Sequence, residues 1–245
     1  MRTILRVLLV LLACTLAIRP AYAVTLGEGH ADFGPTLEGS FALQLRDDTV
    51  TPPQWRNAED VVFALGQASE QQLPEDKDFA FTGAKAGDTV WVIPQTQKAG
   101  VPWLGWNTQA PNIQEAVDRG VTFEYVGHQG PGDFSLFLQD GGLGGPEKLF
   151  VEPGDTAWVD LGTHTHANWV FTQPGTHLVR IKVSAGNHQA TADLRFAVGD
   201  TSEAAIKAAE SSTWEGRSES SRSYIWLIAG GVLIVAALLF LRKKV

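Results

Sequence analysis

The sequence of 245 residues contains a single cysteine, Cys14. Because Cys14 lies in an N-terminal segment that we expect to be removed, the mature chain has no disulfide, no thiolate metal site and no cysteine nucleophile. The stability of the folded part must therefore come from packing. About 175 residues suffice for one sizeable hydrophobic core. This stretch also carries most of the tryptophans, namely Trp55, Trp91, Trp103, Trp106, Trp158 and Trp169.

Basic residues are scarce between the two ends of the chain. The sequence holds 27 acidic and 19 basic residues, and all of the acidic ones lie between Val24 and Ser223. That range contains 13 of the basic residues, so its net charge is −14. Nucleic acids and anionic lipid surfaces need basic patches on their partners. We therefore expect no nucleic acid as a partner.

The sequence also lacks the common motifs of hydrolytic enzymes. It contains no Gly-x-Ser-x-Gly nucleophile elbow and no His-Glu-x-x-His helix. Glu28, Asp32 and Asp133 could in principle act as an acid and base pair on a glycoside, but nothing in their spacing selects them. We therefore predict a protein that is not an enzyme, and a hydrolase stays an alternative.

The N-terminal end has the pattern of an export signal. Arg2 and Arg6 come before and within an apolar run that ends at Ala21-Tyr22-Ala23, a small-x-small site for signal peptidase. Residues 1–23 are predicted to be a signal peptide. Leu11-Leu12-Ala13-Cys14 loosely resembles a lipobox, so lipidation at Cys14 is the alternative to cleavage after Ala23.

The C-terminal end has the pattern of a membrane anchor. Residues 224–241 contain no charged side chain and are followed by Arg242, Lys243 and Lys244. A run of this length can span a hydrocarbon core of ~30 Å, and the basic residues predict that the tail 242–245 is cytoplasmic. We therefore expect a single-pass protein of the cell membrane, with an extracellular domain at 24–199 and a polar stalk at 200–223.

Between these ends, short apolar segments alternate with turns rich in Gly, Pro, Asp and Asn. This pattern predicts an all-β domain, a β-sandwich of the Ig-like or jelly-roll-like kind. A helix is predicted at 111–119 and another at 202–209, with Ser202 as its cap. The predicted strands are 40–45, 61–65, 79–81, 89–93, 121–125, 134–138, 148–151, 157–161, 167–172, 177–183 and 192–198.

One short segment holds two histidines, His164 and His166, two residues apart. If this segment runs into a strand, alternation places both imidazoles and the side chain of Asn168 on one face. Trp169 and Phe171 then point to the opposite face and can enter a core. A polar pair of histidines would thus lie on one face of a hairpin whose other face is aromatic.

A second motif, His30 and Asp32, has the same spacing. Three neutral imidazoles and one carboxylate are a suitable ligand set for a divalent transition metal such as zinc or manganese. We therefore predict a metal site made of His30, Asp32, His164 and His166, provided that the two pairs meet across a sheet. The alternative is that these histidines cap turns or bind backbone groups.

The remaining histidines and a tryptophan cluster have simpler interpretations. His128, His177 and His188 match no ligand pattern and are expected on the surface, although His128 could lie near the site. Trp91, Trp103 and Trp106 could line an apolar cleft or a carbohydrate platform, but core packing is the expected role.

Five sequence blocks carry a resemblance to a known family. They are EGHAD (28–32), VWVIPQTQ (90–97), WLGWNT (103–108), GPGDFSLF (130–137) and HTHANWVFTQPG (164–175), with FAVG (196–199) closing the last. In this order they resemble the actinobacterial surface-anchored protein domain of choice-of-anchor M domain-containing proteins, over about residues 26–199.

The resemblance implies a surface protein that accompanies an ABC-type metal uptake system. It suggests ABC transporter components or other surface proteins as partners, and a metal- or ligand-binding accessory role. The competing hypothesis is a structural or adhesive surface domain with no metal site. In that case the histidines would point apart or contact the backbone, and an exposed apolar patch would bind a protein partner.

Overall fold

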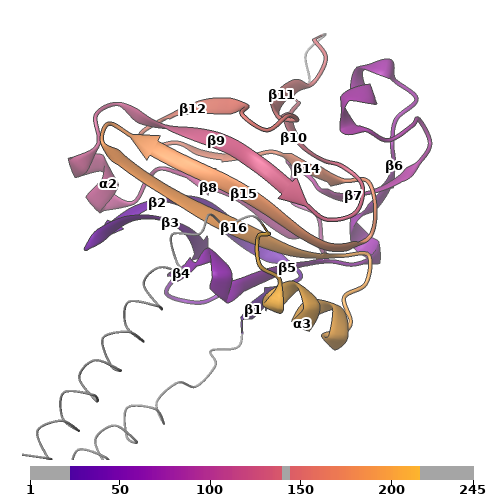
Figure 1. Ribbon diagram of the computed structural model, residues 1–245, viewed down its shortest axis with the longest axis horizontal. Helices are drawn as coiled ribbons and strands as arrows, with labels where there is room; N and C mark the ends of the chain where they lie inside the picture. The colour runs from indigo at the N-terminus through magenta and orange to yellow at the C-terminus, as the bar shows by residue number, and fades with distance from the viewer. Residues whose placement is uncertain (1–22, 140–143, 216–245) are drawn as a thin grey trace, which may run out of the picture. The chain divides into compact units, whose positions relative to one another are not determined.

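The computed structural model describes residues 23–139 and 144–215 (Figure 1). Residues 1–22 of the predicted signal peptide, the predicted transmembrane helix and the predicted tail lie outside the described residues. The chain divides into two compact units, Met1–Ser212 and Thr213–Val245, and every described strand and helix belongs to the first. Within the described residues, no helix is both long and apolar enough to cross a membrane.

The described part of the first unit forms three β-sheets. The six-stranded sheet has the order β1 (Val24–Leu26), β5 (Val61–Leu65), β16 (His188–Val198), β15 (Gly175–Ala185), β9 (Gly120–Gln129) and β12 (Thr156–Asp160). The second sheet has the order β11 (Glu147–Phe150), β10 (Phe134–Leu138), β14 (Asn168–Phe171), β7 (Thr89–Ile93) and β6 (Glu70–Gln72). The third has the order β13 (His164–His166), β8 (Pro102–Asn107), β2 (Gly29–Glu38), β3 (Ser40–Asp47) and β4 (Gln54–Asn57).

The predicted all-β character is confirmed, and the sheets are consistent with a β-sandwich. Most strand pairs are antiparallel, whereas β5 pairs in parallel with β1 and with β16, and β2 pairs in parallel with β8. Figure 1 shows β9, β15 and β16 as long ribbons running side by side. Every predicted strand except 79–81 overlaps a strand of the structure.

The prediction of a strand at 79–81 is wrong, because these residues form part of a 3-10 helix, η3 (Lys77–Thr82). The Asp76 side chain accepts a hydrogen bond from the backbone of Asp78 at its start. Phe79 and Phe81 both pack edge-on against Phe137, with ring centroids 5.8 and 5.3 Å apart. Two phenylalanines two residues apart can therefore share one apolar contact without forming a strand.

The helices within residues 23–139 and 144–215 are short. They comprise α2 (Pro111–Ala116), α3 (Glu203–Ser211) and two further 3-10 turns, η1 (Ala58–Asp60) and η2 (Gln67–Ser69). α2 is shorter than predicted, because Val117 already has an extended backbone. The helix predicted at 202–209 is confirmed as α3, with the Ser202 hydroxyl accepting from the backbone of Ala205. Ala209 of α3 is buried against β5 and β16.

Aromatic side chains meet where the three sheets face one another. Phe33 of β2 contacts Phe123 of β9 and Trp169 of β14, with ring centroids 5.1 and 5.7 Å apart. Trp169 is fully buried, and its indole N–H donates to the carbonyl of Leu104 in β8 at 3.1 Å. The central aromatic cluster therefore holds the third sheet in place through β2 and β8.

The third sheet has one apolar and one polar face. Ala31 and Phe33 of β2 are buried in the core. Because side chains alternate along a strand, His30 and Asp32 point to the opposite face, which we call the outer face of the third sheet. Leu104 of β8 likewise faces the core. The polar residues of β2 are thus displayed on the side of the sheet away from the aromatic cluster.

Candidate metal centre

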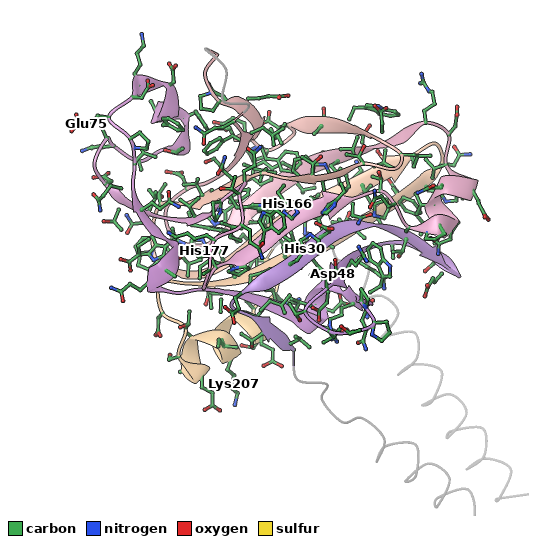
Figure 2. All side chains as sticks on the ribbon, turned by 180° about the vertical axis from the view of Figure 1, so that it is seen from behind. His30, Asp48, Glu75, His166, His177 and Lys207 are labelled. Atoms are coloured by element: carbon green, nitrogen blue, oxygen red, sulfur yellow. The ribbon has the colours of Figure 1, made fainter. Side chains whose placement is uncertain are left out.

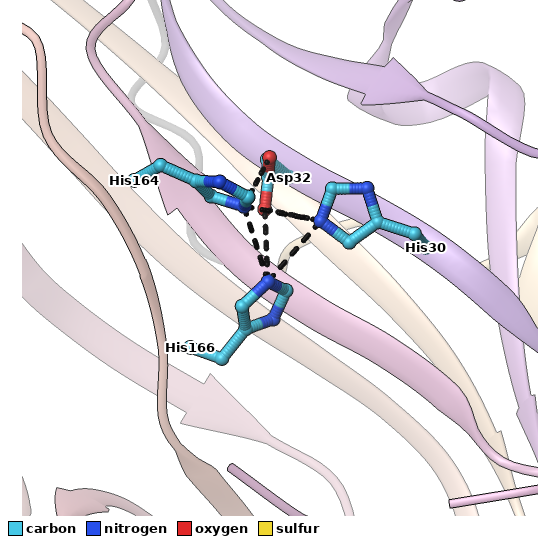
Figure 3. A group of neighbouring side chains, drawn as sticks. All are labelled: His30, Asp32, His164 and His166. Carbon is cyan, nitrogen blue, oxygen red and sulfur yellow. Dashed lines mark hydrogen bonds and ion pairs between the residues drawn. The ribbon is translucent and has the colours of Figure 1, made fainter. Parts of the chain in front are cut away.

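The four predicted ligand residues come together on the outer face of the third sheet (Figure 3), and Figure 2 labels two of them, His30 and His166, close together. His30 and Asp32 lie on β2, and His164 and His166 lie on β13, with β8 between these two strands. One ligand atom from each residue lies within 4.8 Å of every other. The two motifs, separated by more than half of the chain, therefore meet as the prediction requires, and the group could hold a metal ion.

Strand register explains this convergence. Gly105 of β8 pairs with Asp32 on one side and with His166 on the other. A Cβ atom on Gly105 would lie 2.7 Å from Asp32 Oδ1 and 2.8 Å from His166 Nδ1, and it would also meet the carbonyl of Thr165. Only glycine leaves room here, so the two flanking side chains can approach each other across β8.

The spacing of the ligand atoms suits a tetrahedral ion. The Nε2 atoms of His30, His164 and His166 form a triangle with 3.1 Å on each side. Asp32 Oδ2 lies 3.1 Å from His164 Nε2, and Oδ1 lies 3.5 Å and 3.8 Å from the Nε2 atoms of His30 and His166. Four ligands at 2.0–2.1 Å from a tetrahedral zinc are about 3.3–3.4 Å apart.

Hydrogen bonding alone does not account for the triangle. Each Nε2 of a neutral imidazole is either a donor or an acceptor. In a ring of three mutual contacts, at least one contact must join two donors or two acceptors, which repel. A single cation at the centre gives all three nitrogen lone pairs a common partner, and it removes this conflict.

Asp48 fixes the orientation of His30. The Nδ1–H of His30 donates to Asp48 Oδ2 at 2.7 Å, and the Nε of Arg46 lies 3.3 Å from Asp48 Oδ1. Because a carboxylate only accepts, Nδ1 carries a proton, so in the neutral imidazole Nε2 is unprotonated and directed at the group. A carboxylate behind a ligating histidine is a common feature of metal sites. Sequence spacing did not identify Asp48.

We expect Asp48→Asn to weaken metal binding by about 10–100-fold, because an amide neither holds the His30 tautomer as firmly nor raises its basicity. Titration of the purified variant with zinc measures this change. Glu38→Gln is the matched control, since it removes the same charge from the exposed far end of β2. Equal losses in the two variants would contradict the role of Asp48 and indicate a general effect of charge.

Asp32 is the buried member of the group. It is 0 % exposed, and Asn107 Nδ2 donates to its Oδ2 at 3.3 Å. Within the described residues, Oδ1 accepts no hydrogen bond. A buried carboxylate oxygen without a partner is costly. Its position beside three imidazoles is consistent with a cation as the missing partner.

The protonation states also suit metal binding. Burial opposes ionisation of Asp32, but the adjacent His30 and His164 outweigh it and hold its pKa below the ordinary value. Burial lowers the pKa of His166 to about 4, so this imidazole is neutral at neutral pH. Contact with Asp32 is the main cause of a raised pKa for His30. A metal ion would therefore displace a proton chiefly from His30.

Trp103 forms one wall of the group, contrary to the predicted core role. Its ring stacks on His166 at a centroid distance of 3.8 Å and an angle of 9°, and it lies 5.2 Å from His30. The indole N–H donates to the carbonyl of Gln95 at 3.0 Å, which fixes the ring. Trp103 is half-buried, whereas Trp106 does lie in the core.

Asn168 does not join the histidines, so the prediction of one shared face is wrong. Its Oδ1 accepts from the backbone N–H of Gln95 at 3.0 Å. His166 ends β13 in the third sheet, and Asn168 begins β14 in the second. Because the chain changes sheets at Ala167, the alternation of faces does not continue across it.

A second histidine pair lies in the interior, which contradicts the surface prediction for His177. His177 is fully buried and His128 is half-buried, with His128 Nε2 and His177 Nδ1 2.8 Å apart. The Nε2–H of His177 donates to the carbonyl of Gln173 at 3.0 Å, so Nδ1 accepts from His128. His128 thus pairs with His177. The surface prediction is confirmed for His188, which is exposed and stacks on Phe41.

This pair should make folding stability depend on pH. Burial lowers the pKa of both His128 and His177 to about 4, against about 6.5 in the unfolded chain. The unfolded state therefore binds more protons in this window, and stability falls as pH falls from about 6.5 to about 4. The slope is about 1.4 kcal/mol per pH unit for each histidine.

Urea unfolding between about pH 7 and about pH 4.5 tests this dependence. We expect the free energy of unfolding of His177→Gln to fall less steeply with falling pH than that of the unaltered chain. This difference in slope does not depend on how stable the variant is at neutral pH. His188→Ala, at an exposed histidine, should keep the original slope. Parallel pH profiles for the unaltered chain and His177→Gln would refute the assignment.

Comparisons with protein-family models, curated proteins and solved structures found no match for this chain. The resemblance to the surface-anchored domain family therefore stays a prediction. The candidate metal centre is therefore the basis for the function proposed below.

Proposed function

We propose that the protein is a membrane-anchored extracellular protein that binds one divalent transition-metal ion through His30, Asp32, His164 and His166. The observation that carries this proposal is the triangle of three Nε2 atoms, 3.1 Å apart, beside the buried carboxylate of Asp32. The tautomer of His30 and the neutral state of His166 both favour ligation.

Zinc is the metal that fits best. Three imidazoles and one carboxylate match its preference for four tetrahedral nitrogen and oxygen ligands. Manganese, the second candidate, generally binds more oxygen ligands. Four protein ligands also fill a tetrahedral shell and leave no position for a catalytic water, which supports a protein that is not an enzyme.

The exposure of the group favours capture and release of an ion. The His164 side chain is 35 % exposed, whereas the Asp32 side chain is 0 % exposed, so one side of the group is open to solvent. The charge of −14 between Val24 and Ser223 attracts cations to the domain. Together with the family resemblance, this supports a role as an accessory to an ABC-type metal uptake system.

The proposal also includes the type of β-sandwich and the attachment of the domain to the membrane. We retain an Ig-like or jelly-roll-like sandwich, a stalk up to residue 223, a membrane helix at 224–241 and a cytoplasmic tail. The alternative, a structural or adhesive domain, predicts histidines that point apart and an exposed apolar patch. The histidines converge, and Trp158 is the only large apolar side chain classed as exposed in the described part of the chain.

Titration of the purified full chain with zinc, manganese and copper, each with metal analysis, tests the proposal. We expect one ion per chain, with His188→Ala binding as the unaltered protein does. If no ion binds above the level of the variant His164→Ala/His166→Ala, the metal-binding function is wrong. The histidines would then be structural, and a protein partner would be sought instead.

A further inference from the structure

A cavity of about 270 Å³ opens on the outer face of the third sheet, next to the candidate metal centre. Arg46, Trp55, Asn107 and Gln109 line it. Two of these residues also contact residues of the candidate metal centre or the carboxylate behind it. Asn107 donates to Asp32, and Arg46 pairs with the Asp48 carboxylate that orients His30.

Strand register places the cavity and the metal ligands in one row. Trp55 of β4 pairs with Arg46 of β3, Arg46 pairs with Asp32, and Asp32 pairs with Gly105. Gly105 in turn pairs with His166 of β13. Cross-strand partners share a face, and adjacent strands lie about 4.8 Å apart. Arg46 is therefore one strand away from Asp32.

The charge around Arg46 depends on the metal. Asp32 and Asp48 are acidic and Arg46 is basic, so the three together carry −1. A bound divalent ion adds two positive charges, less any proton that it displaces from His30, so the surroundings of Arg46 become more positive. Asp48 is the only carboxylate paired with Arg46 among residues 23–139 and 144–215, and the contact uses Nε. The outer nitrogens of the guanidinium could then bind an anion, which is attracted more strongly when the metal is present.

The cavity walls indicate an organic acid. A planar guanidinium matches a carboxylate through two parallel hydrogen bonds, and the amide of Gln109 offers a further donor. The indole of Trp55 provides a flat apolar wall that suits a carbon skeleton better than an inorganic ion. The volume is just below the usual range of ligand pockets, which suits a small molecule.

We propose that this cavity binds a small organic carboxylate beside the bound metal ion, so that the two ligands bind cooperatively. The inference rests on the proposed metal-binding function. Because such coupling is reciprocal, the carboxylate also tightens metal binding by the same factor. The protein would then hold the ion together with an organic acid.

Calorimetry on the full chain separates the two ideas. Zinc is titrated first, alone, and succinate is then titrated into the zinc-loaded and the zinc-free protein. We expect succinate to bind the loaded protein at least ~10-fold more tightly, given the positive charge that zinc adds one strand away. Phosphate, titrated in the same way, should bind more weakly because it gains nothing from Trp55.

Substitutions in the cavity test whether Arg46 and Trp55 bind the carboxylate. Arg46→Gln should weaken succinate binding at least ~10-fold, as expected for loss of a charge-assisted pair, and should still bind one zinc ion. Trp55 lies on β4, two strands away from Asp32, and we expect Trp55→Ala to weaken succinate binding while zinc affinity stays the same. Lys182→Gln is the matched control, since this lysine lies in β15 and pairs with Glu124.

The outcomes are distinguishable. If zinc does not bind in the first titration, the proposed function fails and this inference fails with it. If zinc binds but succinate binds both forms equally, or if Arg46→Gln and Trp55→Ala leave it unchanged, only the carboxylate site is refuted. Phosphate binding as tight as that of succinate, with the same dependence on Arg46, would overturn the assignment to an organic acid.

Discussion

Replacing His164 and His166 together with alanine is expected to weaken zinc binding by at least about a thousandfold. A structural zinc site of four ligands is worth about 10–16 kcal/mol, or roughly 2.5–4 kcal/mol for each ligand. Losing two ligands therefore costs about 5–8 kcal/mol, and each 1.4 kcal/mol is a factor of about ten in affinity. Only His30 and Asp32 remain, and two ligands do not form a tetrahedral shell.

The loss should come from ligation and leave the fold intact. β13 is the edge strand of the third sheet, and the His164 side chain is 35 % exposed. The far-ultraviolet circular dichroism of the variant should therefore match that of the unaltered chain. Competition with a chromophoric chelator measures the affinities, with His188→Ala as control. An affinity of the double variant within tenfold of the control would place the ion elsewhere.

The fold could be predicted to a large extent, because most strands bury one face and alternate. The segments 61–65, 89–93 and 134–138 coincide with β5, β7 and β10. The strands β2 and β8, which carry or flank the ligand group, did not follow from the pattern. Both contain Gly and Pro, which typically mark turns.

These glycines have a packing role that sequence spacing does not reveal. A Cβ on Gly34 would collide with the carbonyl of Asn107, so β2 and β8 can lie this close only with glycine there. Gly105 makes room for Asp32 and His166 in the same way. Glycine weakens an isolated strand, but here glycine is required for β2 and β8 to pair.

Spacing predicted that His30 and Asp32 share one face, and likewise His164 and His166, because side chains two residues apart on a strand point the same way. Spacing did not show that the two pairs meet, which depends on the pairing of β2 and β13 with β8. The position of Asp48 beside His30 could have been predicted only if the strand β2 had been predicted first. β2 and β3 form a hairpin around Gly39, in which Glu38 pairs with Ser40 and Ala31 with Asp47. Counting back from the turn in equal steps places Asp48 opposite His30. The contact of Trp103 with His30, by contrast, depends on a parallel pairing between strands far apart in the sequence.

Trp169→Ala is expected to lower the free energy of unfolding by about 4 kcal/mol or more. Truncating a buried tryptophan to alanine typically costs about 3–5 kcal/mol through lost burial and the cavity that remains. Trp169 is 0 % exposed and lies 5.7, 5.9 and 6.0 Å from the rings of Phe33, Phe134 and Phe196. The carbonyl of Leu104 also loses its hydrogen bond inside the core, which adds to the cost.

Urea unfolding of the metal-free proteins measures this effect, and two further variants separate its parts. Trp169→Phe keeps a ring in the cluster and should lose about 1–3 kcal/mol, largely from the unpaired carbonyl. Trp158→Ala removes the same side chain at a position that is 54 % exposed, and we expect a loss of at most about 1 kcal/mol. Because Leu104 immediately precedes Gly105, Trp169→Ala should also weaken zinc binding in its folded fraction, whereas Trp158→Ala should not. Equal effects of the two alanine variants on stability and on zinc would show that the aromatic cluster does not hold β8 in place.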